Sequence, residues 1–146
     1  MPKYESYKVG DTEFSFNSFP VIVAKHAYTF ADLDASDDLK IPVESGHIVL
    51  GVAHEVVLAF TGGTPALDIG DGTDVDFWAV NTDLDLSTIG NFYNSMGSAN
   101  AGGAGAKFNS GGIVQLSHAA SLAAGSGVVY IIMLDLNTNW RTSGNI

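Results

Sequence analysis

The chain contains no cysteine, and this absence removes several kinds of chemistry at once. Without thiols there are no disulfides, no thiolate nucleophile and no cysteine-type zinc site, so stability must come from packing. Charge is also scarce, because only 15% of the 146 residues are charged, against about 25% in an average globular domain. The surface therefore has little charge with which to face water.

Positive charge is scarcest, since six Lys and Arg stand against 16 Asp and Glu and leave a formal net charge of −10. A surface that follows phosphates needs basic residues, so nucleic acid is excluded as an expected partner. The N-terminal residues lack the apolar core of a signal peptide, and no apolar run reaches the roughly 18 residues of a membrane span. We expect no membrane partner and a protein that is made in, and first works from, the cytoplasm.

Apolar sequence interrupted by glycine is what the chain has in abundance, with 46% apolar residues and 17 Gly. At this length, that composition indicates one domain with a substantial core. The polar start of the chain precedes the first clear strand pattern, at Phe14 and Phe16. We therefore assign residues 1–13 to an N-terminal arm or frayed terminus, and residues 14–146 to a single β-domain.

Alternating or continuous apolar residues, many of them β-branched, predict strands along most of the chain. Pro20 and Pro42 lack the backbone donor of a sheet ladder, so strand starts, edges or bulges are expected there. Many short strands, few helix caps and abundant Gly favour an all-β fold, a single-domain antiparallel β-sandwich or jelly-roll-like protein. The predicted strands include residues 14–16, 21–30, 39–43, 47–60, 66–69, 75–80, 113–116 and 128–134.

Two of these segments carry the core prediction. Residues 47–60 also show the three- and four-residue spacing of a helix, but their β-branched content and Gly51 favour a strand. A strand of that length spans roughly 46 Å, so we expect a bend or bulge near Gly51. The run 128–134 is apolar on both parities and predicts a central strand covered on both faces. In residues 47–60, the alternate positions that carry the larger side chains are expected to face the core: Ile48, Leu50, Val52, His54, Val56, Leu58 and Phe60.

Residues 68–76 hold four carboxylates, a donor type that Ca²⁺ prefers. The segment does not match an EF-hand: counted from Asp71, Asp76 stands at the sixth position, where the motif needs Gly, and Thr82 at the twelfth, where it needs Glu. An Asx- and Gly-directed turn facing water is the favoured interpretation, and bound calcium is the minority hypothesis. The candidate calcium ligands are Asp68, Asp71, Asp74 and Asp76.

Other candidate chemistry is weak. Asp83 and Asp85 are predicted to share the solvent face of a strand, rather than to form the carboxylate pair of a glycosidase. The four His residues, at positions 26, 47, 54 and 118, have no metal-ligand spacing. On a strand, His54 and Glu55 point to opposite faces, so His54 is expected to be a hydrogen-bonded core or interface residue. We find no catalytic or cofactor-binding residues and expect no enzyme activity.

The Gly- and Asp-rich residues 62–79, the segment 83–90 and the closing strand at 125–130 resemble small virion structural proteins of tailed bacteriophages. The similarity follows the order of features over residues 40–135. It implies a Gly- and Asp-rich β-protein that decorates or cements the capsid, or forms a head fibre or tail component, often as a trimer. That family has no catalytic residues to carry over.

The resemblance implies a capsid decoration protein that binds the outside of a phage head, with itself and the major capsid protein as partners, assembled in the host cytoplasm into the virion. The N-terminal arm would then order on a capsid neighbour. A tail or baseplate component is the nearest alternative. A carbohydrate-binding β-sandwich, stacking sugars on Trp78, Tyr93 or Trp140, with or without Ca²⁺ at residues 68–76, is the rival from another class. Aromatic residues favoured as intersubunit anchors are Trp78, Phe92, Tyr93 and Trp140.

Overall fold

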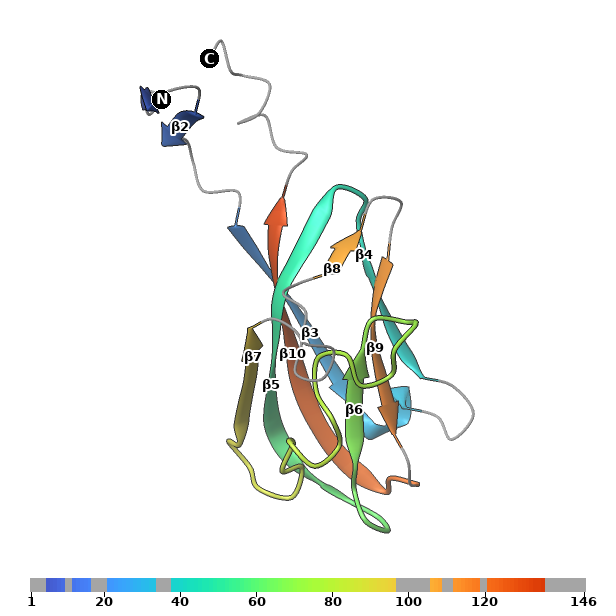
Figure 1. Ribbon diagram of the computed structural model, residues 1–146. Helices are drawn as coiled ribbons and strands as arrows, with labels where there is room; N and C mark the ends of the chain where they lie inside the picture. The colour runs from blue at the N-terminus through green and yellow to red at the C-terminus, as the bar shows by residue number, and fades with distance from the viewer. Residues whose placement is uncertain are drawn as a thin grey trace.

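A computed structural model describes residues 5–9, 12–16, 21–33, 38–96, 106–108, 112–118 and 121–135. These residues form two antiparallel sheets that face each other, together with a separate N-terminal hairpin (Figure 1). The predicted β-sandwich is confirmed. Its strands are β1 (Glu5–Val9), β2 (Thr12–Phe16), β3 (Val21–Thr29), β4 (Leu39–Val43), β5 (His47–Thr61), β6 (Leu67–Gly70), β7 (Phe92–Met96), β8 (Ala106–Phe108), β9 (Gly112–His118) and β10 (Ala124–Asp135), and a 3₁₀ turn, η1 (Phe30–Asp32), follows β3.

The larger sheet has five strands, in the order β3-β10-β5-β7, and β8 also pairs with β5. β7 pairs with residues 51–55 of β5, and β8 with residues 47–49. The smaller sheet has the order β4-β9-β6. β4 lies at an edge of this sheet, so its Pro42 occupies an edge position as predicted. No helix in the described part of the chain is long and apolar enough to cross a membrane.

The core lies between the two sheets and is closed at one side by the connection from β6 to β7. That connection contributes Trp78 and Leu86, which are buried although they belong to no strand. In β4, β6, β9 and β10 the core residues come from alternate positions, which is the pattern of a sandwich interior. The buried cluster consists of Tyr28, Leu33, Ile41, Val43, Val49, Val52, Val56, Phe60, Leu67, Ile69, Trp78, Ala79, Leu84, Leu86, Val114, Leu116, Val129, Ile131 and Met133.

β5 is a single strand with bulges, and these bulges change which residues face the core. Val49 pairs with Met133 and Gly51 with Ile132, so Leu50 is an extra residue at the predicted bulge. A second irregularity leaves Val57 and Leu58 about half exposed. The prediction that one parity faces the core is therefore wrong at Ile48, Leu50 and Leu58. The residues of β5 in the core cluster are Val49, Val52, Val56 and Phe60, and their spacing explains the helix-like periodicity.

β10 is the predicted central strand, because it pairs with β3 on one side and β5 on the other. Its Val129, Ile131 and Met133 are buried, whereas Tyr130 and Ile132 on the opposite face are only half-buried. The sequence predicted full cover of both faces; among the described residues, only the inner face of this strand is fully covered.

The segments 75–80 and 5–9 differ from the sequence prediction. Residues 75–80 do not form a strand, because an Asx turn at Asp71 and a left-handed Gly72 redirect the chain, and only Ala79 bridges to Ile69. Residues 5–9, assigned to the arm, form β1 and pair with β2. Whether this segment acts as an arm stays a prediction.

Candidate functional site

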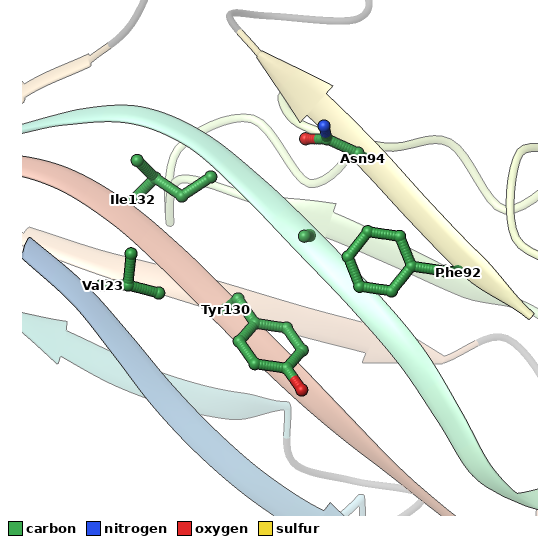
Figure 2. A pocket seen from close by; sticks show the side chains of 6 residues that line it. Val23, Phe92, Asn94, Tyr130 and Ile132 are labelled. Atoms are coloured by element: carbon green, nitrogen blue, oxygen red, sulfur yellow. The ribbon is translucent and has the colours of Figure 1, made fainter. Parts of the chain in front are cut away.

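The outward face of the five-stranded sheet, turned away from the core, carries a shallow apolar groove (Figure 2). The groove has a volume of about 280 Å³ and crosses four neighbouring strands. Ala53 is small and buried at its floor, between the larger Tyr130 on β10 and the residues of β7. Figure 2 shows Phe92 and Tyr130 on the two sides of β5. The lining residues are Val23, Ala53, Phe92, Asn94, Tyr130 and Ile132.

Tyr130 is held in place by three neighbours. Its hydroxyl donates a hydrogen bond of 2.9 Å to Oε2 of Glu55, and its ring centroid lies 6.1 Å from that of Phe92. Nζ of Lys25 lies 6.0 Å from the centroid of the Tyr130 ring, within reach of a cation–π contact. The hydrogen bond to Glu55 is the main cause that raises the pKa of Tyr130. The groove thus has an apolar centre with one acidic and one basic side chain at its rim.

The apolar surface continues from the groove to the edge of the sheet. Val21 and Val23 are 45% and 58% exposed at the start of β3, and Phe92 is 58% exposed across the groove. Among the described strands, β3 pairs with β10 alone, so its other edge is open. An apolar centre with a polar rim is the composition of a protein-binding surface.

The four aromatic residues predicted as anchors have different positions. Phe92 lies at the groove rim, as an anchor would. Tyr93 points to the opposite face and packs against the core, with its hydroxyl 3.4 Å from the carbonyl oxygen of Trp78. Trp78 is 0% exposed, so it offers no surface to a partner subunit or to a sugar ring. Trp140 lies outside the described residues.

Tyr130, Ile132 and Val23 were not predicted as site residues. The available signal was the apolar run of residues 128–134, whose second face we expected to be covered by the chain itself.

The aspartates of residues 68–76 mainly organise turns. Oδ1 of Asp71 accepts hydrogen bonds from the backbone N–H of Thr73 (2.9 Å) and Asp74 (2.8 Å), the Asx turn that the sequence favoured. Oδ1 of Asp68 accepts one from the backbone N–H of Asn81 at 2.6 Å. A side-chain hydrogen bond with Asp74 is the main cause that raises the pKa of Asp76. Over the described residues, no three acidic or histidine side chains gather as metal ligands, and calcium binding stays a prediction.

Asp83 and Asp85 are exposed, as predicted, but they lie in turns and not on a strand. Asp83 accepts a hydrogen bond from the backbone N–H of Val80. Asp85 accepts from the hydroxyl groups of Ser87 and Thr88, each at 2.7 Å, and these bonds lower its pKa. Both carboxylates therefore stabilise the connection between β6 and β7.

His54 is a hydrogen-bonded core residue, as predicted. Its Nε2 lies 2.7 Å from the hydroxyl oxygen of Tyr28, two strands away across β10. Gly127 of β10 leaves the space for this contact, because a Cβ there would lie 2.9 Å from Nε2 of His54 and 3.0 Å from Cε1 of Tyr28. Burial raises the pKa of Tyr28, so its hydroxyl stays protonated.

Comparison with known proteins identifies the fold. No family model matches the chain, and no curated protein matches it. A chain of the solved capsid asymmetric unit of cyanophage Pam1 is 20% identical, with a TM-score of 0.61 over 92% of this chain and 99% of that one. A chain of the capsid of Ralstonia phage GP4 is 16% identical, with a TM-score of 0.55 over 81% and 86% of the two chains. The resemblance to phage virion proteins is thus matched by a shared fold.

Proposed function

We propose that this protein is a structural component of a bacteriophage particle, namely a decoration or cement protein that binds the outside of the head. The observation that carries the proposal is the nearly end-to-end likeness to chains from two phage capsids. The likeness extends over most of the length of both chains in each comparison. A structural role, without catalysis or a cofactor, follows from the same proposal.

The outward face supports this role through its chemistry. Phe92 and Val23 expose apolar surface, and the hydration of such surface is unfavourable in free energy. Contact with a neighbouring protein buries this surface and removes the penalty. Lys25 and Glu55 lie at the rim, where opposite charges on a partner would fix the orientation of the complex. The centre of the groove carries no charge. Such a face suits repeated contacts with the major capsid protein.

Multivalency explains how a small protein stabilises a shell. A trimer presents three identical faces, and once one is bound the other two bind at a high effective concentration. Local opening of the shell must then break several contacts together, because ligands that bind only the closed form shift the equilibrium towards it. Individually weak contacts are sufficient for this purpose.

Binding to capsids tests the proposal. Capsids assembled from the major capsid protein of the same genome are incubated with the purified protein, and occupancy is measured by cryo-electron microscopy and sedimentation. We expect saturable binding to the outer surface, weakened at least tenfold by Phe92→Ser. Ile89→Ser is the matched control, because Ile89 is 63% exposed and does not line the groove. Absence of binding to capsids would overturn the proposal, and binding to isolated tails instead would support the tail or baseplate alternative.

A further inference from the structure

The free edge of β3 lacks the features that usually prevent an edge strand from pairing further. Natural edge strands are often short, or carry a proline or a bulge. The other edge strands of the two described sheets, β4, β6, β7 and β8, have three to five residues, and β4 contains Pro42. β3 has nine residues, no proline and an unbroken register with β10, from Val21↔Leu134 to Thr29↔Ser126. It therefore offers a regular edge of about 30 Å for pairing.

Apolar residues are exposed on both faces at the start of β3. Ile22 pairs with Met133, which belongs to the core cluster, so Ile22 points to the inner side of the sheet. It is nevertheless 39% exposed, and Val21 and Val23 on the outward side are exposed as well. A partner that lies only on the outward groove covers Val23 and leaves Ile22 in water. A strand added beside β3 has side chains on both faces, so it can cover all three residues.

Lys25 determines which kind of strand fits this edge. It is the central residue of β3, the strand contains no acidic residue, and pairing with Tyr130 places Lys25 on the outward face. If two copies of β3 paired antiparallel over their full length, the two Lys25 residues would lie directly opposite each other, where like charges are unfavourable. An acidic residue opposite Lys25 forms a favourable pair instead. The edge therefore favours an extended segment that carries an acid between apolar residues.

We propose that such an extended, acid-bearing segment of the major capsid protein adds to the free edge of β3 as a further strand of the five-stranded sheet. The inference rests on the proposed function and specifies how the capsid protein is held. Main-chain hydrogen bonds to β3 supply affinity, and alternate side chains of the added strand supply specificity. Strand addition is compatible with contact at the groove, because Val23 lines the groove and also belongs to the edge strand.

Amide hydrogen exchange of the protein bound to capsids tests the pairing directly. In an antiparallel pair, alternate residues direct their backbone N–H groups away from the partner strand, so part of the β3 amides should exchange rapidly in the free protein. We expect these amides to exchange at least tenfold more slowly on capsids. The amides of β4, an edge strand of the other sheet, are the reference and should exchange equally in both samples. Unchanged exchange in β3 on saturated capsids would overturn the inference.

Exchange in the free protein distinguishes other occupants of this edge. Slow exchange of all β3 amides in a dilute monomer would mean that the same chain covers the edge. Protection that increases with protein concentration would mean that a second copy covers it. Either result would overturn the inference, whereas rapid exchange at every concentration of the free protein is the result we expect.

Ile22→Ser separates strand addition from contact at the groove alone. We expect this variant to raise the dissociation constant for capsids at least tenfold, because Ile22 loses its contact with the added strand. Val75→Ser is the matched control, since Val75 is 54% exposed and lies in the connection between β6 and β7. Neither residue belongs to the core cluster, so both variants should melt close to the wild-type temperature. Wild-type affinity of Ile22→Ser would overturn the inference and leave the groove contact standing.

Charge reversal at Lys25 tests the acidic character of the added strand. Lys25→Glu should weaken capsid binding at least tenfold at low ionic strength, and added salt should reduce the difference from wild type. Lys40→Glu, on β4, changes the net charge by the same amount and should bind as the wild type does. Equal binding by the two variants would overturn the inference. Absence of capsid binding by the wild type would instead remove the proposed function, and this inference with it.

Discussion

Acidification should destabilise this protein through one buried side chain, His54. The imidazole is 1% exposed, and burial lowers its pKa from 6.5 to about 4, although the nearby Glu55 carboxylate opposes the change. Because the folded value lies below the unfolded one, the unfolded chain takes up the proton first as the pH falls. The contribution of neutral His54 to stability is therefore complete above pH 6.5 and is lost progressively between pH 6.5 and 4.

The size of the effect follows from the two pKa values. Each pH unit between them corresponds to about 1.4 kcal/mol, so the free energy of unfolding should fall by about 2 kcal/mol at pH 5 and about 3 kcal/mol at pH 4. Domains of this kind have a total stability of about 5–15 kcal/mol. Loss on this scale moves the urea midpoint measurably without requiring complete unfolding.

Urea unfolding between about pH 7.5 and pH 5, followed by tryptophan fluorescence, measures the effect. His54→Gln removes the titrating group and should flatten the pH dependence, whereas Tyr28→Phe keeps the imidazole and should retain it, with stability lower by about 1 kcal/mol throughout. The pKa of Asp85 is lowered, so its contribution to the free energy of unfolding is lost only below the pH range of this experiment. The carboxylates are the same in wild type and in His54→Gln, so their titration cancels in the comparison. The same pH slope in wild type and His54→Gln would refute the reasoning.

Three further predictions concern packing, metal binding and the terminus. Gly127→Ala should lower the free energy of unfolding by roughly 1–3 kcal/mol, because the added Cβ displaces the Tyr28–His54 pair; a neutral result in chemical denaturation would contradict this. Calorimetric titration of the chelator-treated protein with calcium should give no binding heat, because Asp71 already accepts two backbone hydrogen bonds; a saturable heat lost in Asp71→Asn would reverse that conclusion. Deletion of residues 1–8 should reduce occupancy on capsids several-fold, since it removes most of β1, and unchanged occupancy would dispose of the arm.

The long strands were predictable because their signal is local and strong. β5 and β10 are β-branched runs too apolar for any surface element, and the length of β5 required the bulge found at Leu50. Residues 75–80 were misassigned because alternation there competes with turn chemistry. Asp71 and Gly72 redirect the chain into a turn. Trp78 therefore belongs to the connection between β6 and β7, which its buried side chain fixes to the core.

The candidate site was predictable only in part, for a different physical reason. Phe92 was expected at an interface because it is aromatic, but nothing in its neighbourhood distinguishes it from the adjacent Tyr93, which the register of β7 turns towards the core. Tyr130 and Ile132 belong to a run that predicts cover on both faces. A sequence pattern shows that a face must be covered, but it does not show whether the same molecule provides the cover.

Charge is scarce on the outward face of the five-stranded sheet. A sheet that faces water on one side normally alternates apolar and polar residues, yet β10 places Tyr130 and Ile132 on its outward face, and β3 adds Val23 beside them. The smaller sheet covers the inner face of these strands, and the described part of the chain provides no third layer for the outer one. The few charges at this face, Lys25 and Glu55, stand at the rim and leave the centre apolar. Under the proposed function, the capsid surface supplies the second cover that the pattern of β10 predicts.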